Sequence, residues 1–316
     1  KKVAVKKIYF SEMDFKNIPQ VLKAESLPYF HIERGNGTKL PVNVVDLGVK
    51  FGYDLPDDGF RRPYYAREVE VTFTLKSDIH FGYELCYVVP SSEPLTKEES
   101  PIWNESQLTF ENEHIVVSVH DNGSYSIEDK HNGKVFEQLG IYEDSGDIGN
   151  EYMFKETGDG KRVTTENVSI SRRVIENNSH RASVEITSTF LVPKSAAEQL
   201  IEERENLVWH PERTAARNEE EVAFTIVTIL TLEEDDKGLK VAVTMDNTAK
   251  DHRLRALFPV GVGNQHHYAD SIFEIAKRPN VPEEQWKNPT FDHHMQRFVS
   301  LDEGEHGLTI AAKGLH

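Results

Sequence analysis

The sequence predicts an all-β fold in which a small β-sandwich is followed by a larger strand-rich unit. Three observations predict it: apolar and polar residues alternate, Asn-Gly pairs separate the alternating runs, and a proline-rich stretch divides the chain. A period of two is typical of antiparallel strands that bury one face. The runs that show this period are Val3–Phe10, Val69–Leu75, Ile115–Val119, Val241–Met245 and Phe273–Ile275.

The Asn-Gly pairs predict tight turns at Asn36-Gly37, Asn122-Gly123 and Asn132-Gly133. In a two-residue type I′ hairpin both central residues need a positive φ angle, which asparagine and glycine adopt most readily. The run Glu113–Phe136 is therefore predicted to be a three-stranded meander.

The boundary between the two units is predicted in the segment Val89–Pro101, which is polar, rich in proline and without periodicity. We assign residues 1–90 to the small sandwich, 91–107 to a linker and 108–316 to the larger unit.

Two segments of the larger unit do not have strand patterning. Residues 194–205 are rich in helix formers, and Ser195, just after Pro193, is the expected N-cap of a short helix. The charged stretch Arg213–Glu220 is expected to be a solvated loop. Trp103, Trp209 and Trp286 are interpreted as core or loop anchors.

Charge and composition exclude several partner classes. The net charge of −17 repels phosphate groups, so neither nucleic acid nor an anionic membrane is an expected partner. No apolar run approaches the ~20 residues of a membrane span, and no signal-peptide core is present, so a cytoplasmic location is expected. The single cysteine, Cys86, is expected to be a small buried hydrophobe.

The segment Tyr142–Phe154 combines carboxylates, an asparagine, glycines and tyrosines, and it is interpreted as a loop that ends at the start of an aromatic strand. Three interpretations stay open: a solvated turn, a calcium loop without the EF-hand spacing, and a sugar contact. In a second segment, Asp251–Pro259, Arg253 and Arg255 have strand spacing, so both face the same way. They either bind a ligand or pin the acidic segment across a sheet.

No metal or dinucleotide site is expected from the residue pattern. The pairs His266-His267 and His293-His294 cannot chelate through both rings, because neighbours on a strand point to opposite faces. The one metal site left open is a site formed where the fold brings together His252, one of the histidine pairs and Asp270. Gly261-Val262-Gly263 is not followed by the helix pattern that a phosphate-binding loop needs.

The order of several motifs resembles the C-terminal half of glycoside hydrolase family 38 α-mannosidases of the bacterial type. The segment Phe60–Arg67 fits the small sandwich that precedes this half. The motifs lie at Leu108–Glu113, Asp121–Gly133, Tyr142–Tyr152, Asp246–Pro259 and Ala269–Pro279.

The resemblance implies a small β-sandwich followed by a large antiparallel β-supersandwich of the galactose mutarotase-like type. It implies a parent enzyme that hydrolyses α-linked mannose with retention, using zinc and two aspartates on an N-terminal α/β barrel. Nothing in this sequence matches that barrel, and the family continues with more strands after residue 316. We therefore expect a fragment that is inactive alone, contains no catalytic residue, metal ligand or cofactor, and is truncated at its end; zinc is expected in the missing N-terminal domain.

The resemblance also implies site residues and partners. A tyrosine of this half hydrogen-bonds the bound sugar in the family, and Tyr152 matches it; Asp147, Asn150 and Glu151 would shape its loop. An arginine lines the site in some members, and Arg253 or Arg255 would be that residue. The implied partners are a mannose-containing oligosaccharide or glycoside and the N-terminal barrel, with self-association into a homo-oligomer left open.

Two other functions are weighed against this one. A non-catalytic carbohydrate-binding sandwich would use the same tyrosine, Tyr152. A stand-alone sugar epimerase of the mutarotase type would use a glutamate and a histidine as acid and base.

Overall fold

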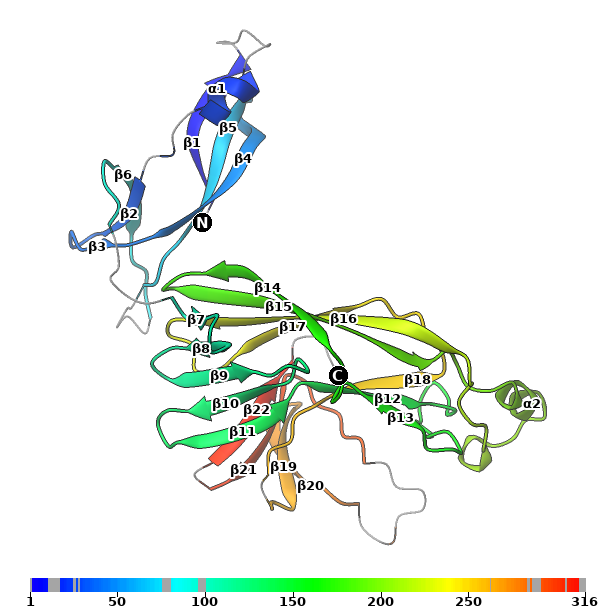
Figure 1. The fold of residues 1–316 in the computed structure, drawn as a ribbon. Coiled ribbons are helices and arrows are strands. Elements are labelled where there is room, and N and C mark those ends of the chain that lie inside the picture. The colour runs from blue at the N-terminus through cyan, green and yellow to red at the C-terminus, as the bar shows by residue number, and fades with distance from the viewer. Residues whose placement is uncertain are drawn as a thin grey trace. The chain divides into compact units, whose positions relative to one another are not determined.

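The computed structural model of the chain describes residues 2–10, 18–24, 27, 29–75, 81–95, 101–261, 263–282, 285, 291–304 and 306–312. Antiparallel strands dominate the described part, together with two seven-residue α-helices, and this confirms the all-β prediction (Figure 1). Neither helix has the length or the apolar character to cross a lipid bilayer.

The chain forms two compact units, which are described separately. Unit 1 comprises residues 1–102 and 177–182, and unit 2 comprises residues 103–176 and 183–316. The predicted linker over 91–107 includes residues 96–100, which lie outside the described residues, as do Val262 of the Gly261-Gly263 motif and Trp286.

In the part of unit 1 that the structure describes, the chain forms two three-stranded antiparallel sheets and the helix α1 (Ile18–Ala24). Phe30, Ile32, Val69 and Val71 form a buried cluster, against which Cys86 packs. One sheet has the strand order β1 (Lys2–Tyr9), β5 (Arg62–Thr72), β4 (Asn43–Asp54). The other has the strand order β3 (Lys39–Leu40), β2 (Tyr29–Arg34), β6 (Cys86–Ser91).

The first strand contains a β-bulge that the sequence pattern already carries. The apolar residues Val3 and Val5 are two apart, but the next one, Ile8, comes three positions later. The register of β1 against β5 shifts between Ala4 and Lys6. An extra residue at a bulge shifts the alternation of the following side chains by one position. Ile8 therefore lies on the apolar side of the strand.

The described residues of unit 2 form four antiparallel sheets, and the predicted meander forms three strands of the first (Figure 1). The sheets, in strand order, are β11 (Lys134–Leu139), β10 (Tyr125–Asp129), β9 (Ile115–Val119), β8 (Thr109–Glu111), β7 (Trp103–Asn104); β14 (Ile170–Asn177), β15 (Arg181–Pro193), β16 (Glu221–Glu233), β17 (Lys240–Met245); β13 (Arg162–Thr164), β12 (Ile141–Gly146), β18 (His252–Leu257); and β20 (Glu274–Pro279), β19 (His266–Ser271), β21 (Phe298–Glu303), β22 (His306–Ala311).

The core of unit 2 joins β12 to the sheet of β15 and β16. Phe190, Val192, Phe224 and Ile226 pack with Tyr142 in one buried cluster. The hydroxyl of Tyr142 also lies 2.8 Å from that of Thr228 on β16. This contact fixes β12, the strand that leads into the candidate site.

The three Asn-Gly turns form, but not as type I′ turns. Only their glycines have positive φ angles, of 82°, 83° and 70°. In each turn the asparagine side-chain oxygen instead accepts a hydrogen bond from the backbone N–H two residues later. This local bond supplies the turn without a left-handed asparagine.

The predicted helix begins later than expected. Helix α2 spans Gln199–Glu205, with Glu198 rather than Ser195 at its N-cap position. Residues 194–197 pair with the returning chain instead: Lys194 N donates to Glu220 O and Ala197 N to Ala216 O, both at 2.9 Å. These backbone bonds keep the segment extended until Glu198.

Two other expectations differ from the structure. The Val241–Met245 run forms the edge strand β17, but its residues are exposed rather than half-buried. Phe273 is exposed at the turn between β19 and β20. Of the tryptophans, Trp103 is buried whereas Trp209 is exposed.

Candidate functional site

The strand β12 leads into the candidate site, and the prediction of a loop over residues 143–146 is wrong. All six residues of β12 are buried, and the strand pairs with β13 on one side and β18 on the other. The carboxylates of this strand are buried because cations from distant segments reach them. Glu143 and Asp144 point to opposite faces, so each meets a different set of partners.

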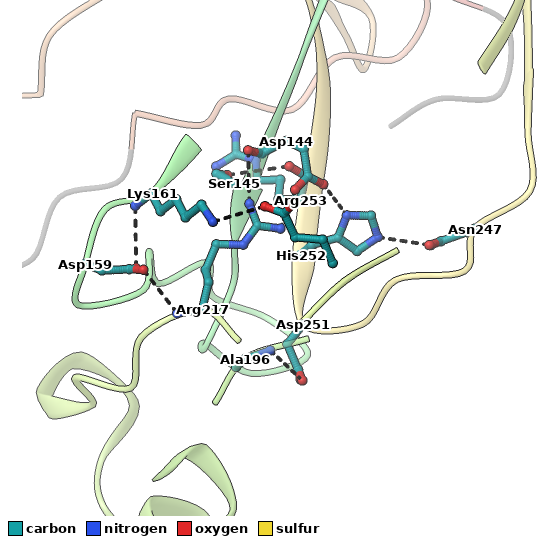
Figure 2. Close-up of polar contacts among 11 residues, drawn as sticks. Asp144, Ser145, Asp159, Lys161, Ala196, Arg217, Asn247, Asp251, His252 and Arg253 are labelled. Atoms are coloured by element: carbon teal, nitrogen blue, oxygen red, sulfur yellow. Dashed lines mark hydrogen bonds and ion pairs between the residues drawn. The ribbon is translucent and has the colours of Figure 1, made fainter. Parts of the chain in front are cut away.

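Asp144 lies in a buried ion-pair network (Figure 2). Its Oδ1 accepts a hydrogen bond from Arg217 Nη2, and its Oδ2 contacts Nδ1 of His252. The Nη1 of Arg217 also donates to the backbone oxygen of Asp144 at 3.2 Å. The Nε2 of His252 lies 2.9 Å from Oδ1 of Asn247. The side chains of Asp144 and Arg217 are each 1% exposed, so water does not screen this pair.

Glu143 is paired on the other face of the sheet. Its partner is Arg255, which stands opposite in the β12–β18 register. Arg162 of β13 approaches Glu143 at 3.6 Å and donates from Nε to Glu156 at 2.6 Å. The hydrogen bonds from Arg162 hold the pKa of Glu156 below its usual value of 4.5. The structural interpretation of the arginine pair, which pins the acidic segment across a sheet, is confirmed for Arg255.

Asp147 opens the loop that follows β12, residues 147–154. Its Oδ1 accepts hydrogen bonds from the backbone N–H groups of Gly149 at 2.9 Å and Lys155 at 3.2 Å. The backbone of Asp147 also forms an isolated bridge with Glu156. One side chain therefore closes the base of the 147–154 loop.

Asn150 folds the tip of the 147–154 loop. Its Oδ1 accepts hydrogen bonds from the backbone N–H groups of Tyr152 and Met153, both at 2.9 Å. Its Nδ2 lies 3.2 Å from Nδ1 of His210. The backbone from Glu151 to Phe154 is not in a strand, so the aromatic strand expected after this motif is absent.

Arg213 braces the same loop from behind. Its Nη1 donates to the backbone oxygens of Ile148 at 2.9 Å and Gly149 at 2.6 Å. Ile148 is fully buried in a cluster with Leu200 of α2 and two alanines. The 147–154 loop is therefore fixed by side-chain caps, a guanidinium and an apolar anchor.

Tyr152 is presented to solvent on this fixed loop. It is 90% exposed, and its hydroxyl forms no hydrogen bond with the described residues. Glu151 beside it is exposed as well. A fixed backbone with a free aromatic side chain is a suitable contact for a ligand.

The two predicted arginines have different partners. Arg253 donates from Nη2 to Asp292 at 2.6 Å, and its guanidinium lies 4.3 Å from the ring centroid of Phe154. Arg253 therefore contacts the 147–154 loop, whereas Arg255 is bound to Glu143. The proposed sugar-binding role of Asp147, Asn150, Glu151, Tyr152, Arg253 and Arg255 stays a prediction.

Within the described ranges, no three His, Cys, Asp or Glu side chains converge to hold a metal ion. The metal site that the sequence left open, which needs His252 and Asp270 close together, does not form in the described residues. His252 is bound to Asp144, and Asp270 accepts a hydrogen bond from Arg297 Nε at 2.8 Å.

The sequence interpretation missed two arginines that hold the candidate site, Arg213 and Arg217, because the stretch 213–220 was expected to be solvated. In the structure Arg217 and Ala215 are buried. The available signal was the uncharged run Thr214-Ala215-Ala216 between the two arginines, since small residues in a charged segment indicate close packing.

Comparisons with known proteins identify the family. Residues 1–90 match the model of "Glycosyl hydrolases family 38 C-terminal domain 1", and residues 110–314 match "Glycosyl hydrolases family 38 C-terminal domain". A putative mannosylglycerate hydrolase of Halalkalibacterium halodurans is 58% identical over all 316 residues of this chain, which cover 35% of that relative.

Two solved structures from Enterococcus faecalis are similar. An α-mannosidase of strain V583 has a TM-score of 0.90 and 34% identity, over 98% of this chain and 35% of its own. A protein in glycosyl hydrolase family 38 has a TM-score of 0.86 and 32% identity, over 98% of this chain and 36% of its own. The chain thus spans about a third of the length of these relatives. The sequence resemblance is confirmed: the chain belongs to glycosyl hydrolase family 38, whose C-terminal domains it comprises.

Proposed function

We propose that this chain is the C-terminal all-β part of an α-mannosidase-type glycoside hydrolase and that its 147–154 loop completes the sugar site of the longer protein. The observation that carries this proposal is the exposed Tyr152, whose hydroxyl bonds no described residue. Asp147, Asn150 and Arg213 hold the backbone around it. Because the loop is already ordered, little conformational entropy is lost when a sugar ring contacts the tyrosine.

The names of the relatives support hydrolysis of a mannoside. One is named a putative mannosylglycerate hydrolase and another an α-mannosidase. In this proposal α-linked mannose is hydrolysed with retention, by two aspartates and a zinc ion of a barrel that precedes this chain. The described residues do not fit zinc, because no ligand set converges in them. The zinc ion of the barrel is part of the proposal.

Glu143 and Asp144 do not have the geometry of a glycosidase acid/base pair. Such a pair flanks one glycosidic bond, whereas these two side chains lie on opposite faces of β12. Each also binds a guanidinium, from Arg255 or Arg217. Their role is to hold β12, and Tyr152 supplies the contact with the substrate.

Tyr152→Phe in the full-length protein tests the proposal. Loss of one hydrogen bond to the sugar is expected to lower kcat/KM for an aryl α-mannoside roughly 3- to 10-fold. The matched control is Tyr83→Phe, at another exposed tyrosine, which lies in unit 1. Equal rates for both variants would remove Tyr152 from the site. Mannoside binding without turnover would favour the carbohydrate-binding alternative.

A further inference from the structure

A cavity of about 580 Å³ lies where β18, β19, β21 and residues 293–295 meet. Its polar lining comes from two arginines of β18, one histidine of β19 and two histidines of the segment before β21. These residues are Arg253, Arg255, His267, His293 and His294.

The charge of this lining is opposite to that of the chain. Acidic residues outnumber Lys and Arg by 53 to 36 in the sequence, yet none of the described residues that line the cavity is acidic. A lining with the average composition of the chain would carry a negative charge. Two guanidinium groups instead stand at this concave surface, and the carboxylates paired with them, Asp292 and Glu143, are not among the lining residues.

Both arginines keep unused donors. Arg253 gives one nitrogen to Asp292, and Arg255 gives one to Glu143, whereas a guanidinium carries five N–H donors. The Nε of Arg255 is buried and bonds no acceptor among the described residues. A buried donor without an acceptor costs free energy, which a bound anion would recover.

Histidine rings stand beside the arginines in the lining of the cavity. The ring centroids of His267 and His293 are 4.8 Å apart. Burial, followed by the neighbouring His267 and Arg278, lowers the pKa of His293. Burial disfavours a charge of either sign, whereas the contributions of His267 and Arg278 have the sign of positive surroundings, which favour an anion.

We propose that this cavity binds an oxyanion group, a carboxylate or a phosphoryl group, with Arg253 and Arg255 as the anchoring donors. Both anions match the fork of a guanidinium. Arg253 also stacks on Phe154, two residues from Tyr152, so the cavity adjoins the 147–154 loop. In this respect the inference rests on the proposed function: the anionic group belongs to the mannoside that the longer protein hydrolyses.

Calorimetry tests the cavity without catalysis. The full-length protein is titrated with inorganic phosphate and with glycerate at constant ionic strength, and both are expected to saturate one site. Arg253→Gln and His293→Gln are expected to weaken binding about tenfold or more. His293 lies outside any strand, so its variant tests the cavity even where Arg253→Gln fails to fold.

The control for these titrations is Arg173→Gln, which removes an exposed arginine paired with Glu185 on another sheet. It is expected to bind both anions as the unmodified protein does. Absence of saturable binding, or equal binding by all variants, overturns the assignment. The tighter of the two anions identifies whether the group is a phosphate or a carboxylate.

Hydrolysis separates this inference from the proposed function. The two cavity variants are expected to lose about tenfold more kcat/KM on mannosylglycerate, which carries a carboxylate, than on a neutral aryl α-mannoside. An equal loss on both substrates overturns the inference and leaves the proposed function standing. If the unmodified protein hydrolyses neither substrate, the proposed function fails, while calorimetry still decides whether the cavity binds anions.

Discussion

At the scale of single residues, the buried pair of Asp144 and Arg217 constrains the sequence most. Gly146 leaves room beside the pair, because a Cβ there would collide with Cγ2 of Thr157 and lie 2.9 Å from Cγ of Arg217. Gly149 has a similar role in the loop, since a Cβ on it would collide with the backbone oxygen of Met153. Side-chain size is therefore restricted at both positions for reasons of packing.

Arg217→Met is expected to lower the free energy of unfolding by about 3–5 kcal/mol, because it leaves a buried carboxylate with only His252 as partner. Urea unfolding followed by circular dichroism measures this loss. The control Arg173→Met breaks a pair in which the arginine side chain is 67% exposed, and should cost less than ~1 kcal/mol. Similar losses for the two variants would contradict a buried charge at Asp144.

Sequence reasoning reached the local contacts of the site but not the distant ones. Asp147 and Asn150 bond backbone groups within eight residues of themselves, and such turns are written in the residue types. Arg217 lies 73 positions from Asp144, so only the tertiary fold brings the two together. A buried strand containing two carboxylates was consequently interpreted as a loop.

At the scale of elements, helix α2 serves as the apolar anchor of the 147–154 loop. Leu200→Ala is expected to cost about 2–5 kcal/mol, because Leu200 is fully buried against Ile148. It should also speed hydrogen exchange at the amides of residues 148–155. Ile201→Ala, one position along the helix but exposed, is the matched control. Unchanged exchange in the Leu200 variant would separate α2 from the loop.

The strand β13 is tied down by a charge pair that depends on pH. Because Arg162 lowers the pKa of Glu156, this carboxylate stabilises the fold above pH 4.5, and the contribution is lost as pH falls through its lowered folded-state value. Arg162 is partly exposed, so the contribution stays below ~1 kcal/mol.

Glu156→Gln should therefore flatten the stability profile between pH 6 and pH 3 by that small amount, as followed by urea unfolding at each pH. Glu137→Gln, on the exposed face of β11, is the control. A profile as steep as that of the unmodified chain would show that the Arg162–Glu156 pair contributes nothing.

The elements themselves were predictable where the pattern is local. The meander follows its predicted turns. The bulge of β1 was not predicted, although the three-residue step from Val5 to Ile8 marks it. The start of α2 was not predictable, because the pairing of residues 194–197 with the returning chain overrides their helix propensity.

At the scale of the whole molecule, the site is expected to be incomplete in this chain. The 316-residue chain, incubated with zinc and an aryl α-mannoside, should show no turnover above the uncatalysed rate. Both carboxylates of β12 bind cations in the structure. The full-length protein at the same concentration is the positive control. Turnover at an enzyme-like rate by the chain alone would place acid and base within it.

Arg213 and Arg217 both belong to one excursion of the chain, residues 194–220, but they bind different targets. Arg213 binds the 147–154 loop, and Arg217 binds Asp144. Homologues that vary in length here should accumulate insertions near Leu207, which faces water. A deletion between the two arginines would withdraw one guanidinium from its target. Evolutionary drift in this excursion is therefore expected to preserve the four-residue spacing of the two arginines and the buried Leu200, while changes of length gather at the exposed turn around Leu207.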